Sequence, residues 1–242
     1  MIVLAILLTA FVLPLVVYAP EPESLRDVEK PKLTQRVKAA AGTLALGIAL
    51  IVIASATFTP NGLAIDSMME EIFGLSRDGV LVKGRVFQLI TSSFIHINLF
   101  HLASNLFALM LLAVYERRVG YRRLLVVFLI ASFVSSLGDL LLLPSDVVSM
   151  GASAGICGIA AAYFLDYEET TGLDWIKGVV VVLILVGLYS FADTATAERL
   201  IGRVNWAAHL SGAFAGAAYV RVFPKRMAAP LASRRAGNSC SR

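Results

Sequence analysis

Two polar residues in apolar, small-residue stretches are of the types that nucleophilic catalysis requires. Ser153 lies in the stretch GASAG (151–155), and His209 lies 56 positions later in the stretch AAHLSG (207–212). A serine hydroxyl is a weak nucleophile until a base takes its proton, and a histidine within hydrogen-bond reach is a suitable base. Because an intramembrane polar side chain costs about 2 kcal/mol or more unless it is paired or hydrated, both residues are functional candidates.

The alternative for Ser153 is a packing residue that hydrogen-bonds to its own helix, which is the commoner role of a lone membrane serine. A partner reverses that preference. Gly212 and Gly216 form a GxxxG face on the segment of His209, and Gly151 belongs to the small-residue surroundings of Ser153. Small residues let two helices approach closely, so the two segments are expected to bring the histidine ring to the serine hydroxyl.

A second polar cluster lies in the stretch HINLFHLASN (96–105). His101 and Asn105 are four residues apart and therefore share one face of a helix. They are too few to bind a metal, and no metal site is predicted. They suit hydrogen-bond donation to an anionic tetrahedral oxygen, although a polar clamp between helices, worth about 1 kcal/mol, is the alternative. His96 is assigned a structural role. No carboxylate is placed to orient the base, so a Ser-His dyad is predicted rather than a triad.

The composition predicts an all-α polytopic membrane protein. The chain has 242 residues, of which 58% are hydrophobic, and its mean hydropathy of +0.78 is too high for a soluble domain. The formal net charge is +4, but the basic residues lie beside apolar segments, which indicates membrane orientation rather than nucleic-acid binding. No cofactor is predicted, and the spacing of the two cysteines fits neither a metal site nor a disulfide.

Apolar segments of about 20 residues divide the chain into spans. Residues 1–19 form an N-terminal span without the positive start of a signal peptide, although a cleaved or interfacial segment remains the alternative. A polar linker (20–37) precedes a six-span unit (38–222), in which 59–95 forms an interfacial first loop, and a basic tail (223–242) follows. The six predicted spans of the unit are 38–58, 96–115, 122–143, 149–165, 178–192 and 205–222.

Basic residues predict the orientation of these spans. With an outside N-terminus and an inside C-terminus, 16 of the 21 Lys and Arg residues lie on the inner side. This topology places Ser153, His209, His101 and Asn105 toward the outer ends of their spans. The expected location is a multi-pass position in the cell membrane, with the lipid bilayer around it.

The ordered set of motifs resembles the rhomboid family of intramembrane serine proteases over about residues 38–222. The resemblance implies a six-span helical bundle that cleaves single-span membrane proteins near the outer face. Ser153 would be the nucleophile and His209 the general base, and His101, Asn105 and the Ser153 backbone N–H would form the oxyanion hole. Arg85 would help anchor the first loop. The matching motifs are Gly84-Arg85, FIH (94–96), the HxxxxHxxxN of His96, His101 and Asn105, ERRVG (116–120), the GxS of Gly151 and Ser153, and AHxxGxxxG (208–216).

Three positions depart from the family pattern. Ala154 follows the serine where glycine is usual, so a methyl group is expected to lie beside the oxyanion site. Cys157 replaces an aromatic residue that packs beneath the base, and Gly84 replaces a tryptophan of the first loop. The departure at Ala154 favours, as an alternative, a non-catalytic relative that binds membrane helices. A small transporter is the other alternative, but the spans carry almost no charge.

Overall fold

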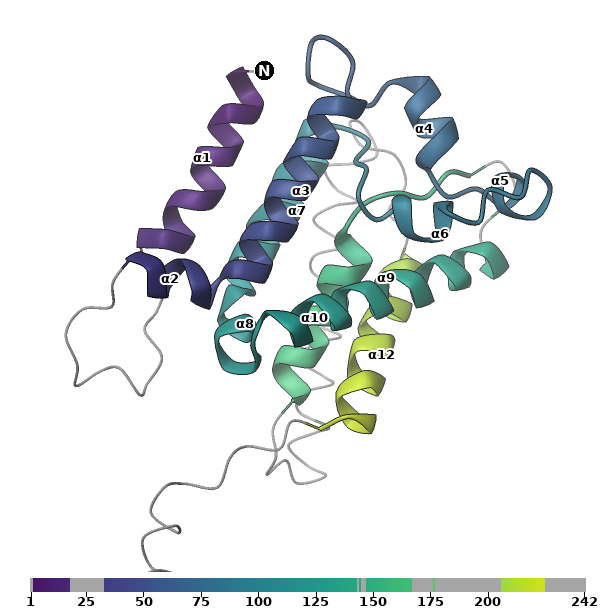
Figure 1. Ribbon diagram of the computed structural model, residues 1–242. Coiled ribbons are helices and arrows are strands. Elements are labelled where there is room, and N and C mark those ends of the chain that lie inside the picture. The colour runs from purple at the N-terminus through teal and green to yellow at the C-terminus, as the bar shows by residue number, and fades with distance from the viewer. Residues whose placement is uncertain are drawn as a thin grey trace, which may run out of the picture.

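The computed structural model describes residues 2–17, 33–142, 144, 147–166, 176 and 206–224. Within these ranges the chain is helical, and its only β-structure consists of isolated bridges (Figure 1). The predicted span 178–192 lies outside the described residues, as do residues 20–32 of the predicted linker and most of the predicted tail. The prediction of an all-α chain is confirmed for the described part.

The N-terminal part consists of an apolar hairpin. Helix α1 (Ile2–Val17) runs beside α3 (Ala41–Thr57), and the short α2 (Leu33–Ala39) precedes α3 (Figure 1). Helices α2 and α3 together are apolar enough to cross a membrane, but they meet at an angle of 73°. The predicted linker therefore ends in a helix.

The predicted interfacial segment 59–95 folds into three short helices beside one end of the bundle (Figure 1). These are α4 (Ser67–Phe73), α5 (Arg77–Leu81) and α6 (Gln88–Thr91). The side chains of Asp66 and Ser76 accept hydrogen bonds from backbone N–H groups in the first turns of α4 and α5, as N-caps do. The position of these three helices beside the bundle is compatible with an interfacial loop. The depth of the 59–95 segment in a bilayer stays a prediction.

The remaining described helices form the bundle. Helix α7 (Leu99–Leu111) continues into α8 (Ala113–Val119), and Gly120, at φ +86°, allows the turn into α9 (Tyr121–Leu142). Helices α10 (Ser153–Leu165) and α12 (Trp206–Val222) pack against each other and against α9. These bounds lie close to four of the predicted spans.

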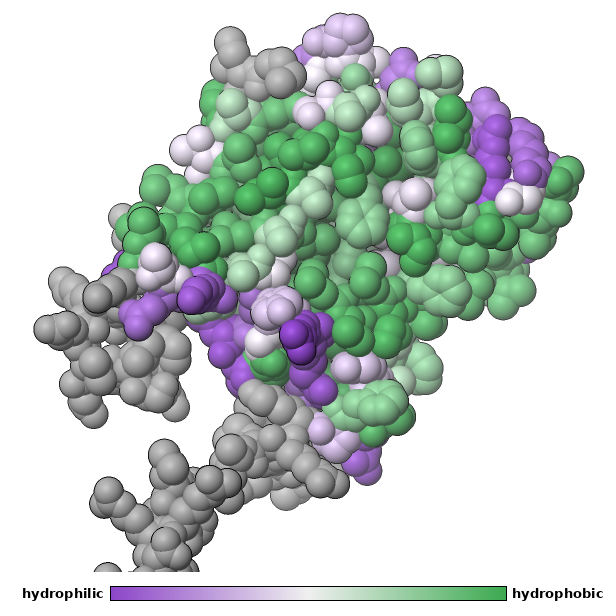
Figure 2. Space-filling view, in the orientation of Figure 1, coloured by the Kyte–Doolittle hydropathy of each residue, from purple (hydrophilic) through white to green (hydrophobic). Residues whose placement is uncertain are grey.

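Two helical segments, Leu99–Val119 and Tyr121–Leu142, are each long and apolar enough to cross a membrane unaided. Leu4–Val17 and Ser153–Leu165 are shorter apolar helices. Figure 2 shows a broad hydrophobic band across the middle of one face, with hydrophilic residues gathered toward two ends of the molecule. This pattern is that of a membrane helical bundle. The count of six spans and the additional N-terminal span stay predictions.

Charged side chains, of which Glu116 and Asp166 are buried, join the helices at the end of the bundle opposite the 59–95 segment. The Glu116 carboxylate accepts the N–H groups of Gly42 and Thr43 and the Thr43 hydroxyl, each at 2.7 Å. It therefore satisfies the first free N–H groups of α3 and complements the helix dipole. Arg123 binds Asp166 through two bonds of 2.7 and 3.0 Å, which ties α9 to the end of α10.

Candidate active site

Ser153 and His209 are in contact. The distance from Ser153 Oγ to His209 Nε2 is 2.9 Å, and both side chains are buried, with exposed fractions of 8% and 3%. Ser153 is the first residue of α10, and His209 lies in the first turn of α12. The two predicted partners are thus at neighbouring helix starts, within the distance that proton transfer requires.

Close approach of α10 and α12 makes this contact possible. A Cβ atom on Gly212 would lie 2.8 Å from the carbonyl carbon of Ala154, and one on Gly216 would lie 2.7 Å from that of Gly158. These glycines leave no room for a side chain, so the two backbones touch along the small-residue faces. Ser135 of α9 also donates a hydrogen bond of 3.1 Å to the carbonyl of Ala208, directly before the histidine.

His101 lies against the segment that leads to the nucleophile. Gly151 has φ +121°, and a Cβ there would lie 2.8 Å from His101 Nε2, so the position requires glycine both for its conformation and for space. One helical turn further along α7, Asn105 is fully buried and donates 2.9 Å from Nδ2 to the His101 carbonyl. The Asn105 Oδ1 and His101 Nδ1 atoms have no hydrogen-bond partner within the described ranges.

His96 is fully buried beside His101. The two rings meet edge to face, with centroids 5.2 Å apart. Neither ring nitrogen of His96 has a hydrogen-bond partner in the described part of the chain. Its packing against His101 fits the predicted structural support, because it limits where that ring can lie.

The 59–95 segment holds the backbone that precedes Ser153. Leu75 and Ser149 exchange two backbone hydrogen bonds of 2.9 Å, and the N–H of Gly151 donates to the Ser92 carbonyl at 2.8 Å. At the same end, the guanidinium of Arg77 donates to the Leu140 carbonyl through bonds of 2.9 and 2.7 Å, which caps α9. The 59–95 segment is therefore hydrogen-bonded both to the residues that precede Ser153 and to the last turn of α9.

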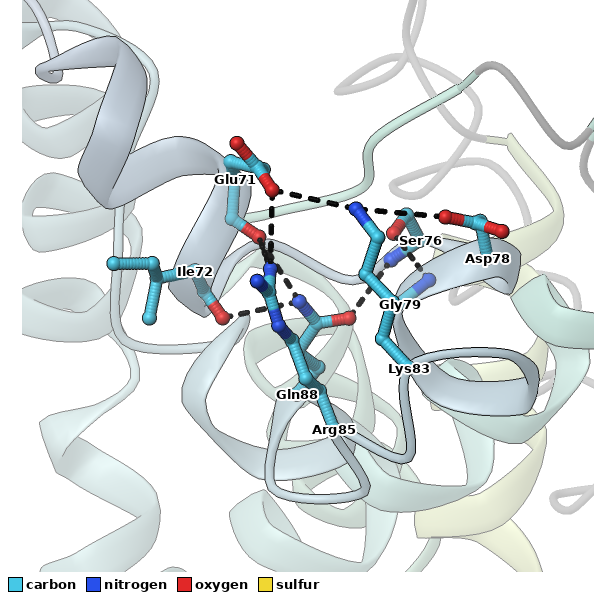
Figure 3. A network of polar contacts seen from close by, with 8 residues as sticks. All are labelled: Glu71, Ile72, Ser76, Asp78, Gly79, Lys83, Arg85 and Gln88. Carbon is cyan, nitrogen blue, oxygen red and sulfur yellow. Dashed lines mark hydrogen bonds and ion pairs between the residues drawn. The ribbon is translucent and has the colours of Figure 1, made fainter.

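Gln88 is buried and joins parts of the 59–95 segment to one another, and the sequence interpretation did not identify it (Figure 3). Its amide nitrogen donates to the carbonyls of Glu71 and Ile72 at 3.1 and 3.0 Å, and its oxygen accepts the Ser76 N–H at 3.3 Å. A Cβ on Gly79 would lie 2.9 Å from the Gln88 amide carbon. No feature of the sequence marked Gln88, because its burial becomes visible only in the folded 59–95 segment.

Arg85 contacts the same segment from a more exposed position. Its Nη1 atom donates to the Glu71 carbonyl at 2.9 Å and lies 3.4 Å from the Glu71 carboxylate (Figure 3). The predicted anchoring role agrees with these contacts and stays a prediction. Lys83 lies 3.3 Å from the same carboxylate, and this hydrogen bond, together with the charges of Lys83 and Arg85, lowers the pKa of Glu71.

Two of the departures from the family pattern, Ala154 and Cys157, lie in the packed interior of the bundle. Ala154 presents its backbone to Gly212, and a Cβ on the following Gly155 would lie 2.5 Å from the Phe128 ring and from Ser132 Oγ. Glycine is therefore needed one position after Ala154, where α10 meets α9. Cys157 is buried in a small cluster with Ala161 and Ala213, one turn below Ser153 and His209.

The described residues contain no group of three or more His, Cys, Asp or Glu side chains that could hold a metal ion. The chemistry on hand is that of a buried serine in contact with a histidine, beside a face with polar donors. The class that the fold and this site define is a helical membrane protein with a buried pair of serine and histidine side chains.

The comparisons with known proteins identify the family. The family model described as the Rhomboid domain matches residues 83–226, which include every residue of the site, and the chain belongs to the rhomboid family.

Among relatives, YdcA of Bacillus subtilis (strain 168), named as a candidate rhomboid protease, is 29% identical over 140 residues, which are 56% of this chain and 66% of YdcA. RHOMBOID-like protein 7 of Arabidopsis thaliana is 26% identical over 155 residues, 62% of this chain and 47% of the relative. Rhomboid-like protein 11, chloroplastic, of the same plant is 32% identical over 153 residues, 57% of this chain and 53% of the relative. The matches thus span between 47% and 66% of the length of these relatives.

Proposed function

We propose that the chain is an intramembrane serine endopeptidase that cleaves single-span membrane proteins near the outer membrane face. The observation that carries the proposal is the 2.9 Å contact between Ser153 Oγ and His209 Nε2 in a buried site. A buried serine that only packs would bond to its own helix carbonyl, whereas this one meets a base on another helix. Membership of the rhomboid family supports the same reading.

The positions of the groups support the following reaction. Ser153 Oγ attacks the substrate carbonyl carbon while His209 Nε2 takes the hydroxyl proton. The tetrahedral oxyanion is held by the Ser153 N–H and by donors on the α7 face, His101 and Asn105. His209 then gives its proton to the leaving amine, the C–N bond breaks, and a serine ester remains. Water, deprotonated by His209, hydrolyses that ester and restores the serine.

The oxyanion role requires one rearrangement. Asn105 Nδ2 now donates to the carbonyl of its own helix, so it must turn toward or be shared with the oxyanion as charge develops. Such tightening in the transition state is what raises kcat rather than substrate affinity. A substrate helix must also unwind locally, because a helical carbonyl is already hydrogen-bonded.

The location belongs to the same proposal. The protein is placed in the cell membrane, with its C-terminus inside and the 59–95 segment at the outer face. Because Ser153 lies at the end of α10 nearest that segment, water can reach the site from the outer side without crossing the apolar band. The lipid bilayer and single-span substrates are the proposed partners.

A reporter-cleavage assay tests the function. A purified single-span reporter with small residues at the top of its span is incubated in detergent with wild-type enzyme, Ser153→Ala or His209→Ala. Each variant is expected to lower kcat at least about 10³-fold, since removal of a member of a catalytic set has effects of this order. Ser55→Ala, which removes an exposed hydroxyl bonded to a carbonyl of its own helix α3, is the matched control. Cleavage by Ser153→Ala at the wild-type rate would overturn the proposal.

A further inference from the structure

Helix α1 is seated on the bundle by a side chain that fits a notch. Phe11 is 3% exposed, and its ring lies over Gly47 of α3. A Cβ on Gly47 would lie 3.0 Å from the Phe11 Cδ1 atom and still closer to two other ring atoms, so any side chain there excludes the ring. Leu4 and Leu15 are buried in the same core. The contact is a knob in a specific hole rather than loose apolar association.

A second fastening holds the other end of α1. Arg36 of α2 donates from Nη1 to the Val17 carbonyl at 2.9 Å. Val17 is the last residue of α1, and the last carbonyls of a helix lack partners of their own. A cation at this position also complements the negative end of the helix dipole. The helix is therefore fixed along its length by Phe11 and at its end by Arg36.

The helix also contacts α7, which carries His101 and Asn105. On one side α7 packs against α3 and α1, and on the other the His101 ring meets Gly151. The opposite face of α1 exposes Ile6 and Leu13, which suits contact with lipid. Helix α7 thus contacts both α1 and, through His101, the segment that leads to Ser153.

We propose that the α3–α7 face is a docking surface whose occupant is the chain's own residues 2–17, and that this docked helix positions α7 against the Ser153 segment. Phe11 and Gly47 are then positioning residues, which act on the reaction through His101 and Asn105. The effect on catalysis rests on the proposed function, whereas the docking does not.

The first test measures docking in the full chain without reference to activity. A site for a sequence-specific protease is inserted within residues 20–32, the purified protein is cut in detergent, and size-exclusion chromatography follows the N-terminal fragment. The fragment is expected to co-elute in the wild type and to separate in Gly47→Leu. Val52→Leu, at an exposed position of the same helix, should co-elute as the wild type does. Retention of the fragment by Gly47→Leu would overturn the docking.

The second test measures positioning. Gly47→Leu is expected to lower kcat on the reporter about tenfold or more with little change in KM, because an oxyanion donor is worth about 10²–10³ in kcat and part of that is lost when α7 shifts. Combining it with Phe11→Ala, which vacates the space that the leucine fills, should restore both co-elution and kcat. An undocked Gly47→Leu with wild-type kcat would overturn the positioning role. A wild type without activity would refute the proposed function and leave the docking result standing.

Discussion

Gly212→Ala is predicted to disable the site without touching either reacting residue. The new Cβ would lie 2.8 Å from the Ala154 carbonyl carbon, whereas ordinary contact begins at 3.4 Å. Helices α10 and α12 must therefore separate by about 0.6 Å or more. Because these helices carry Ser153 and His209, their contact would lengthen from 2.9 Å to about 3.5 Å, beyond the range of an effective O–H···N hydrogen bond.

The magnitude follows from this displacement. Overpacking of a close helix interface costs about 1–3 kcal/mol of folding free energy. A misplacement approaching 1 Å in a reacting group costs about 10²-fold in rate. The variant is thus expected to fold with a lowered melting temperature and to retain about 1% of wild-type kcat.

A matched variant separates this effect from the general cost of a new methyl group. Gly138 of α9 also faces α12, but a Cβ there would lie 3.5 Å from Ser211 Oγ, which is ordinary contact. Gly138→Ala should therefore keep kcat within about twofold of the wild type. Initial rates of reporter cleavage and thermal melting in the same detergent give both quantities.

The reasoning would be refuted if Gly212→Ala and Gly138→Ala cleaved the reporter equally well. Loss of folding by Gly212→Ala is a separate outcome that melting detects. A folded Gly212→Ala with wild-type kcat would contradict the claim that this contact sets the serine-histidine distance.

Three further predictions concern groups away from the reacting atoms. Glu116→Gln should lower the free energy of unfolding by at least about 2 kcal/mol, because the Glu116 carboxylate accepts three hydrogen bonds from the start of α3. Thr43→Val, which removes one of these donors, should lower it by about 1–2 kcal/mol. Denaturant titration measures both. Gln88→Leu strands the Ile72 carbonyl and the Ser76 N–H at about 1 kcal/mol each, while the Glu71 carbonyl keeps its bond from Arg85, and the variant should have lower stability and lower kcat. A variant that melts earlier with unchanged kcat would contradict the link of Gln88 to the Ser149 segment. Contact with Lys83 lowers the pKa of Glu71 in the folded protein below its ordinary value of 4.5. The ionised Glu71 carboxylate should therefore stabilise the fold above pH 4.5, and this stabilisation should disappear as the pH falls further. The melting temperatures of the wild type and Glu71→Gln should differ at about pH 7 and converge in acid.

The pairing of Ser153 with His209 could be predicted from the sequence because few residue types activate a serine and few polar residues occur in the apolar segments. The close packing of the two helices that carry them could be predicted as well, since Gly212 and Gly216 form a small-residue face on the helix of His209. The assignment of His101 and Asn105 to one helical face is confirmed by α7, and their catalytic role stays a prediction.

Other parts of the site could not be read from one sequence. The fastening by Gln88 depends on three backbone groups that only the folded 59–95 segment brings together. The notch at Gly47 depends on a ring 36 positions away, and a glycine in an apolar helix gives no sign of which residue fills its space. The expectation that Ala154 would crowd the oxyanion site is not tested by these contacts, which show its backbone meeting Gly212.

The central claim is that His209 activates Ser153, and covalent labelling tests it most directly. The purified protein is treated with a fluorophosphonate, and intact-mass and peptide mass spectrometry measure the rate and site of the adduct. The account predicts an adduct on Ser153 in the wild type and loss of labelling in His209→Ala. An unlabelled Ser153 in the folded wild type, or equal labelling without His209, would contradict it.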